Sequence, residues 1–221
     1  MTPTRTSEAP HKPSLLAKKQ PSQQRSTQTY ELILQATAEV LADVGIERLS
    51  TNLVCERAGL SPPALYRYFP NKYALLSELG QRLMQRQNEL IPRWISPEVL
   101  GSSPAELEKA LAGLVLDTYR VTKRTPGGVW ILRALRAVPA LLKVRLDSHD
   151  AVSKAQTRML KQAFPQVSSK ELALVGRVAV DVLYAAVEML FDTPLNARAV
   201  AKIAAAMVAS HLDRLRSRQQ V

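Results

Sequence analysis

The chain has few of the residues that build crosslinked folds and small metal centres. Among its 221 residues there is one cysteine, Cys55, and there are three histidines, His11, His149 and His211. A single cysteine excludes an internal disulfide, and thiols and imidazoles this sparse exclude a cysteine-rich zinc site. We therefore expect no metal and no cofactor, and we interpret Cys55 as a small core residue.

Long apolar runs are also missing. No charge-free apolar stretch reaches the roughly 18 residues that a membrane span needs, and residues 1–28 are polar apart from Leu15 and Leu16. Aromatic residues make up only 5% of the chain, so an interior rich in Ala and Leu is expected, which favours helices. These features predict a cytoplasmic protein that has no membrane partner.

Basic residues are in excess, with 30 Lys and Arg against 19 Asp and Glu and a net charge of +11. Such an excess suits an acidic partner such as nucleic acid. Residues 27–80 nevertheless hold four basic and six acidic side chains, so binding of an acidic partner by this part must rely on a few placed contacts and on helix amide ends. Residues 1–26 are rich in proline and hold five basic side chains against Glu8, which predicts a flexible basic tail. Its role as a solvated leader or as an arm along a DNA backbone stays open.

The spacing of apolar residues changes to that of helices from Thr29 onward. A first helix is expected to end at Gly45, a second to run from a cap at Ser50 to Gly59, and a third to follow a cap at Ser61. A fourth helix is expected from Asn71 to about Pro92. Further helices are predicted at 104–124, 129–138, 140–164, 169–191 and 195–216, and no segment alternates with period two. The sequence therefore predicts an all-α protein of about nine helices.

The second and third helices follow the helix-turn-helix plan, in which a second short helix enters the DNA major groove. Gly59 allows the sharp turn between them, while Val54, Leu65 and Phe69 can hold the two helices together. The face left outward carries aromatic and basic side chains: Pro63, Ala64, Tyr66, Arg67 and Tyr68.

Residues 49–72, which read LSTNLVCERAGLSPPALYRYFPNK, closely resemble the TetR family of bacterial transcriptional regulators. The likeness extends to ILQATAEVLADVG at 33–45 and YALL at 73–76, about a quarter of the chain. The resemblance implies a homodimer that places two recognition helices in successive major grooves of a near-palindromic operator, with a small molecule controlling release. It also implies three parts: a tail at 1–26, a helix-turn-helix DNA-binding domain at 27–72, and a helical effector-binding and dimerisation domain at 73–221.

The resemblance also implies roles for individual residues. Thr51 and Asn52 would meet phosphates, and Lys72 would hold another beside the amide end of the fourth helix. Four residues would line the groove: Ala64, Tyr66, Arg67 and Tyr68. Pro63 and Tyr68 depart from the family, which often has Gly, Ser or Thr at the first position and His at the second. These departures affect the expected base preference more than DNA binding itself. Packing of a tyrosine on the bundle is the alternative, but two tyrosines at i and i+2 cannot both face one core.

The last two predicted helices have small, apolar faces that a dimeric four-helix bundle would bury. Burial inside one subunit is the alternative. The predicted seam consists of Gly176, Ala179, Leu183, Ala186, Val187, Leu190, Ala197, Val200, Ala201, Ala204 and Val208.

The helices between 104 and 164 can enclose an effector cavity. Seven residues are candidates for its wall: Trp94, Tyr119, Arg120, Trp130, Arg133, Arg136 and Tyr184. No acid opposes the basic side chains between Tyr119 and Leu146, which indicates either a solvated basic face, the favoured interpretation, or a pocket for an amphipathic anion. A neutral hydrophobic effector is the alternative to the anion.

The sequence lacks paired carboxylates, a nucleophile motif and a glycine-rich phosphate loop, so we expect no enzyme. It predicts a ligand-responsive homodimeric repressor that binds DNA. The competing hypothesis is a ligand-sequestering or membrane-surface helical protein that has lost operator binding.

Overall fold

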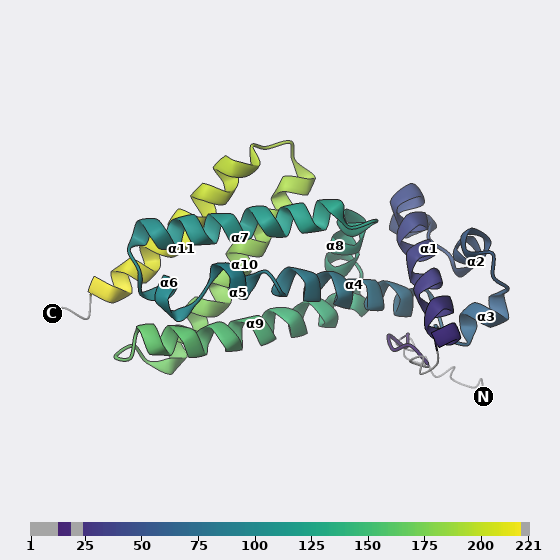
Figure 1. The fold of residues 1–221 in the computed structure, drawn as a ribbon, viewed down its shortest axis with the longest axis horizontal. Helices are drawn as coiled ribbons and strands as arrows, with labels where there is room; N and C mark the ends of the chain where they lie inside the picture. The colour runs from purple at the N-terminus through teal and green to yellow at the C-terminus, as the bar shows by residue number, and fades with distance from the viewer. Residues whose placement is uncertain (1–12, 19–23, 218–221) are drawn as a thin grey trace, which may run out of the picture.

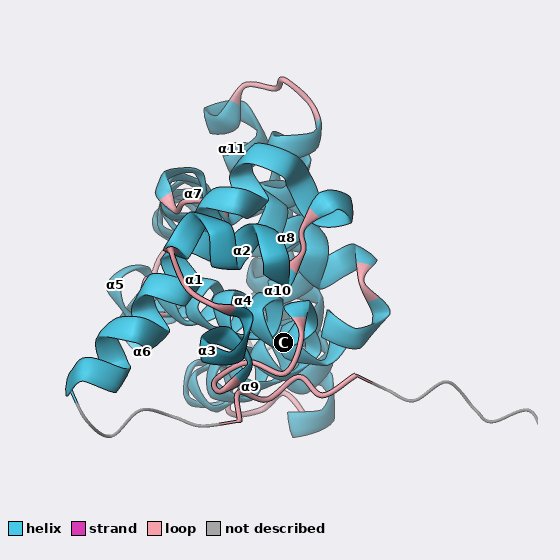
Figure 2. Ribbon diagram, turned by 90° about the vertical axis from the view of Figure 1, so that its right-hand side faces the viewer, coloured by secondary structure: helices cyan, strands magenta, loops and turns pink. Residues whose placement is uncertain are grey.

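The computed structural model describes residues 13–18 and 24–217, and every regular element among them is helical (Figures 1 and 2). The elements are α1 (Gln24–Arg48), α2 (Thr51–Ala58), α3 (Pro62–Tyr66), α4 (Lys72–Asn88), α5 (Ile91–Trp94), α6 (Pro97–Gly101), α7 (Pro104–Arg124), α8 (Gly128–Ala137), the 3₁₀ helix η1 (Pro139–Leu141), α9 (Leu142–Ala163), α10 (Ser169–Asp192) and α11 (Ala197–Ser217). The predicted all-α class is confirmed. The fourth helix ends at Asn88 rather than Pro92, and the two short helices α5 and α6 were not predicted.

The three N-terminal helices are bounded by the residues that the sequence indicates. The backbone of Gly45 leaves the helical region with φ 74° and separates the last residues of α1 from the rest. The Ser50 hydroxyl accepts the Leu53 N–H at 3.3 Å, and Gly59 ends α2 in the left-handed region, φ 63° and ψ 32°. Because a side chain is strained there, glycine suits this turn.

The expected side-chain cap of α3 is wrong. Ser61 stands at the N-cap, but its hydroxyl accepts no amide. The first two helical residues are Pro62 and Pro63, which carry no N–H, and the Ala64 amide bonds the Ser61 carbonyl at 3.0 Å. The prolines themselves remove the amides that a cap would satisfy.

The helix-turn-helix lies at one end of an elongated molecule, and α4 leads from it into a longer helical body (Figure 1). One core joins α1–α4 to α8 around Phe69, Leu75 and Leu135. A second core fills the body, where α7 packs against α11 and α9 against α10. Since α4 contributes to the first core and also contacts α7 and α9, it connects the two parts of the chain.

Helix α8 lies against both α1 and α4 at the junction between the helix-turn-helix and the body. A Cβ on Gly80 of α4 would lie 2.7 Å from Leu135 Cδ2, and one on Gly127 would lie 2.7 Å from the Ala38 carbonyl oxygen. Gly127 also has a positive φ of 64°. The two glycines thus permit a close approach of α8 that larger residues would disturb.

Helices α10 and α11 bury most of the residues predicted for the dimer seam within their own subunit. Gly176, Leu183, Ala186, Val187, Leu190, Ala201, Ala204 and Val208 are all buried in the single chain, while Ala179, Ala197 and Val200 are half-buried. The assignment of the buried set to an intersubunit seam is therefore wrong, because α7 and α9 already cover this side of the two helices. Within the described ranges no helix is long and apolar enough to cross a membrane.

Candidate nucleic-acid interface and ligand cavity

Helices α2 and α3 lie at one end of the molecule (Figures 1 and 2), and α3 and the start of α2 carry exposed polar side chains. The Tyr66 side chain is exposed, and its hydroxyl lies 2.9 Å from the Thr51 hydroxyl of α2. Asn52, Pro63 and Arg67 are exposed beside them, and Ala64 is half-buried. The structure thus brings the predicted contacts of α2 and α3 to one face.

The N-terminus of α4 lies next to this surface. Asn71 caps the helix by accepting the Ala74 N–H at 3.0 Å, and its amide donates to the Ser14 carbonyl at 3.1 Å. Lys72 Nζ donates to the Leu49 carbonyl at 3.2 Å, which holds the ammonium near the loop before α2. An ammonium and a helix amide end at one place form a site suited to a phosphate.

Tyr68 does not belong to this surface, and the expectation that it lines the groove is wrong. Only 4% of the residue is exposed, and its ring packs edge-on against Tyr30 of α1 at a centroid distance of 6.0 Å. The spacing argument for two tyrosines assumes one continuous helix. Since α3 ends at Tyr66, the following turn directs both Tyr68 and Phe69 into the core.

Most acids of the helix-turn-helix region are paired away from α3. Glu39 and Asp43 of α1 hold Arg57, with the shorter contact at 2.6 Å. Glu31 and Glu78 hold Arg82 of α4. These four carboxylates are therefore neutralised by Arg57 and Arg82 rather than placed against the polar face of α3, even though residues 27–80 carry a net negative charge.

Arg67 is the cation placed at the end of α3. Among the described residues it has no ion-pair partner, and its guanidinium lies 5.9 Å from the centroid of the Tyr68 ring. The buried tyrosine thus supports a guanidinium that remains available to an anionic partner.

Comparison with known families identifies this module. The family described as bacterial regulatory proteins, tetR family, matches residues 33–79, the segment that contains α2, α3, most of α1 and the first half of α4. Residues 33–79 are therefore similar to the DNA-binding module of the TetR family. The tetracycline repressor protein class C of Escherichia coli is 43% identical over 54 residues, which is 24% of this chain and 25% of that protein. An uncharacterised HTH-type transcriptional regulator of Mycobacterium bovis is 30% identical over 83 residues, 38% of this chain and 42% of its own. The chain therefore matches only between a quarter and less than half of the length of these relatives.

The fold as a whole resembles those of solved TetR-family proteins. A putative TetR-family regulator from Syntrophomonas wolfei aligns with a TM-score of 0.65 at 10% identity, over 84% of this chain and 95% of that one. A putative TetR-family regulator from Mesorhizobium loti aligns with a TM-score of 0.63 at 14% identity, over 86% and 97%. At such identities the likeness concerns the fold alone, including the helical body beyond the matched domain.

The three arginines predicted for the effector site face solvent, so that assignment is wrong. Arg120 pairs with Asp117 at 2.7 Å and Arg136 with Glu188 at 2.9 Å. Arg133 donates to the Phe191 carbonyl at 3.1 Å and pairs with Asp192. The basic stretch looked unopposed because two of these acids lie far away in sequence, on α10. The favoured interpretation, a solvated basic face, describes these side chains.

The predicted aromatic residues do not share one cavity. Trp94 Nε1 donates to Asp117 at 3.0 Å on the body, whereas Trp130 packs over Gly45 at the junction with α1. Tyr119 packs on Phe191 at 4.8 Å. Tyr184 is the one among these four that lines an internal cavity, between α4, α7, α9 and α10.

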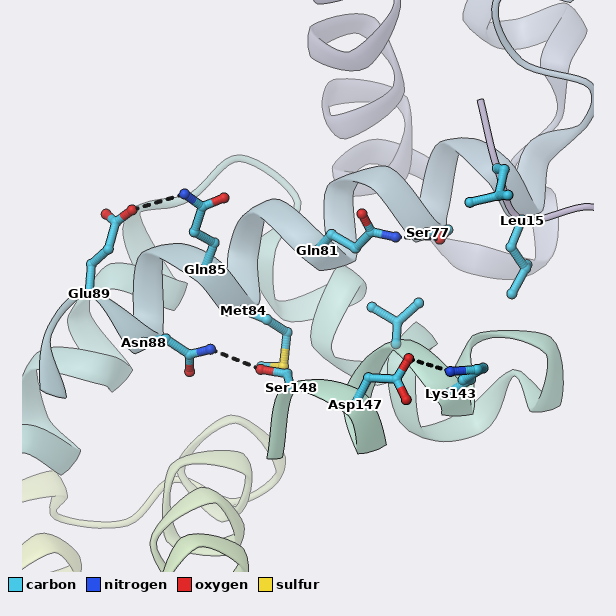
Figure 3. Close-up of a pocket in the computed structure, with 12 residues that line it drawn as sticks. Leu15, Ser77, Gln81, Met84, Gln85, Asn88, Glu89, Lys143, Asp147 and Ser148 are labelled. Carbon is cyan, nitrogen blue, oxygen red and sulfur yellow. Dashed lines mark hydrogen bonds and ion pairs between the residues drawn. The ribbon is translucent and has the colours of Figure 1, made fainter. Parts of the chain in front are cut away.

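An open groove of about 860 Å³ separates α4 from α9 (Figure 3). The N-terminal residues Leu15 and Leu16 line it, with Leu15 at one end. Its polar side chains are largely paired with one another. Gln85 donates to Glu89 at 3.2 Å, and Lys143 donates to Asp147 at 2.6 Å. The segment before α1 is fixed there by a hydrogen bond of 2.7 Å from the Lys18 amide to the Tyr68 carbonyl.

Buried polar residues that sequence reasoning missed surround the internal cavity. Gln87 is 1% exposed on α4, and its amide donates to the Thr122 hydroxyl at 2.7 Å. Behind Tyr184, the buried His149 ring stacks at 4.3 Å and its Nδ1 lies 2.7 Å from Asp181. The available signal was position: Gln87 and His149 stand where the helix period places apolar residues. Groups of three or more side chains suited to a metal ion are absent from the described part of the chain.

Proposed function

We propose that the chain is a homodimeric transcriptional repressor that binds a near-palindromic DNA operator and is released by a small-molecule effector. The observation that carries the proposal is the α3 surface, where Tyr66, Arg67 and Thr51 lie together beside the N-terminus of α4. This surface belongs to a TetR-family module, and part of the chain resembles tetracycline repressors. The division into a DNA-binding domain at 27–72 and an effector and dimerisation domain at 73–221 is part of the proposal.

In the proposed complex, α3 enters the major groove. Arg67 reaches a guanine edge or a phosphate, Ala64 contacts a thymine methyl, and Tyr66 donates its hydroxyl to a base edge or phosphate. Thr51, Asn52 and Lys72 bind the backbone and fix the register. Pro63 contributes shape alone, since it has no N–H.

The proposed dimer uses a face of α10 and α11 that the single chain leaves exposed. Leu174, Val178, Ile203 and Met207 have exposed fractions between 52% and 65%. With Ala179 and Val208 several of them line a groove of about 370 Å³. Large apolar side chains gathered on one face favour a protein partner, and a second copy of the chain would close a four-helix bundle. Two recognition helices would then face successive turns of DNA.

The proposed effector site is the cavity that α4 shares with α7, α9 and α10. Its position supports a link to DNA binding, because α4 begins at Lys72 beside the recognition surface and ends at Asn88 beside the cavity. An effector releases DNA only if it binds the released conformation more tightly than the bound one.

Selection of bound duplexes from a random pool, using the full chain, tests the proposal. We expect an inverted repeat, and we expect Arg67→Ala to lower affinity for it by at least about tenfold, as for loss of one good base or phosphate contact. Arg93→Ala is the matched control, since Arg93 is an exposed arginine on α5 in the body. Ligand binding without any sequence-preferring, salt-dependent duplex binding would favour the sequestering protein instead.

A further inference from the structure

The internal cavity is small, and its lining is mainly apolar. It measures about 30 Å³, roughly the volume of one water molecule in the liquid. Its walls are mainly aliphatic and come from three helices of the body: Leu114, Val115, Val152, Val180, Leu183 and Val187. Gln87 of α4 and Thr118 of α7 also line it.

The orientation of the Gln87 amide is fixed by its neighbours. The Thr122 hydroxyl donates its proton to the Thr118 carbonyl at 2.8 Å, so it can only accept from Gln87. Gln87 therefore donates through Nε2 at 2.7 Å, and its carbonyl oxygen Oε1 is directed elsewhere. That oxygen is buried and has no hydrogen-bond partner. A buried acceptor left unpaired costs about 1–3 kcal/mol, so the site favours a ligand that donates a hydrogen bond.

None of the described residues that line the open groove of Figure 3 has a buried polar atom without a hydrogen-bond partner. Its Asn88 amide donates to Ser148 at 3.0 Å, and its Gln81 amide donates to Ser77 at 3.3 Å. The unsatisfied acceptor distinguishes the internal cavity from this larger space.

A second groove provides a route to the cavity. It measures about 350 Å³, lies beside α5, and shares three lining residues with the cavity: Ile91, Val152 and Gln156. Gln156 is half-buried and makes no hydrogen bond to another described residue, so its side chain is free to change rotamer. Pro92, Ala155 and Met159 give the outer groove an apolar floor. Among the described residues, no acidic or basic side chain lines either space.

We infer that the effector is a neutral, elongated apolar molecule whose single hydrogen-bond donor binds Gln87 Oε1 while its apolar body lies in the groove beside α5. The inference rests on the proposed effector response and defines the chemical class that this site recognises. Binding requires Gln156 to rotate and the cavity to widen from the volume of one water. A carboxylate is disfavoured, because its oxygens would face the Gln87 carbonyl oxygen without a cation nearby.

Two isomeric probes isolate the donor: 1-octanol and heptyl methyl ether have the same heavy atoms, but only the alcohol donates. Calorimetric titration of the full chain should show 1-octanol binding about tenfold more tightly than the ether, as expected for one buried hydrogen bond. Octanoate should bind most weakly. Gln87→Leu should abolish the difference between alcohol and ether. Gln85→Leu, two residues away on the exposed side of α4, should preserve it.

A second variant tests the access route without touching the buried amide. Ala155→Trp places a bulky ring in the outer groove at an exposed position, and it should abolish binding of both probes while leaving the thermal unfolding midpoint unchanged. Equal affinity for alcohol and ether in the unaltered chain would overturn the donor requirement. Tightest binding by octanoate would overturn neutrality. No binding of any probe would mean that the cavity holds a water molecule only. None of these titrations contains DNA, so failure of operator binding is a separate result.

Discussion

At the residue scale, the decisive feature of this protein is how neighbouring side chains divide between surface and core. Tyr66 is 40% exposed on the recognition surface, while Tyr68 is 4% exposed against Tyr30. The two residues are chemically identical, so the end of α3 between them determines their roles. Tyr66 is available for the proposed DNA contact, whereas Tyr68 packs beneath the Arg67 guanidinium, which lies 5.9 Å from its ring centroid.

His149 makes stability depend on pH. Burial lowers the pKa of His149 below its ordinary value, although the carboxylate of Asp181 acts in the opposite direction. The unfolded chain therefore takes up the proton first as the pH falls, and the stability associated with neutral His149 is lost from about pH 6.5 downward.

We expect the free energy of unfolding in urea to decrease between pH 7.5 and pH 5.5, with His149 contributing at most about 1.4 kcal/mol per pH unit. His149→Gln retains a donor for Asp181 but does not titrate in this range, so its stability should change less over the same interval. Equal pH dependence in the two proteins would show that folding does not lower the pKa of His149.

At the element scale, α8 connects the body to the helix-turn-helix. Its Trp130 packs over Gly45 of α1, and its Leu135 packs over Gly80 of α4. The turn before α8 approaches the Ala38 carbonyl so closely that only glycine fits at position 127. Movement of α8 is therefore coupled sterically to α1 as well as to α4.

Gly127→Ala tests this packing. The left-handed backbone alone costs alanine about 1–2 kcal/mol, and the new Cβ would meet the Ala38 oxygen, so we expect the free energy of unfolding to fall by at least about 1 kcal/mol. Gly101→Ala is the control, since a Cβ there meets nothing within 4 Å. Urea denaturation of both variants measures the effect, and similar stabilities would contradict a tight α8 junction.

At the scale of the whole molecule, assembly depends on the exposed face of α10 and α11. We expect Met207→Glu to convert the proposed dimer into a monomer, because a carboxylate on a residue that is 63% exposed in the single chain would be buried without a partner in the pair. Sedimentation should show half the mass, and affinity for a two-half-site operator should fall with it.

Leu146→Glu provides the control for that experiment. Leu146 is also an exposed leucine, 38% accessible, but it lies on α9 away from this face. Loss of the dimer in both variants, or in neither, would contradict the assigned surface.

The sequence by itself determined the local structure of this protein. The Ser50 cap, Gly59 at the end of α2 and the apolar period of each long helix specify the elements through contacts within a few residues. The specific run of residues 49–72 was enough to identify the DNA-binding module, and most of its proposed contacts lie on the predicted face.

Only the tertiary structure decided which side of each helix is covered. Helices α10 and α11 are apolar on more than one side, and the sequence could not show that α7 and α9 already occupy the side with Leu183 and Ala204. Nor could it show that Arg136 meets Glu188 of α10, or that Gln87 is left with an unpaired oxygen. Periodicity fixes a residue's angle on its own helix, whereas burial and pairing depend on neighbours that are distant in the chain.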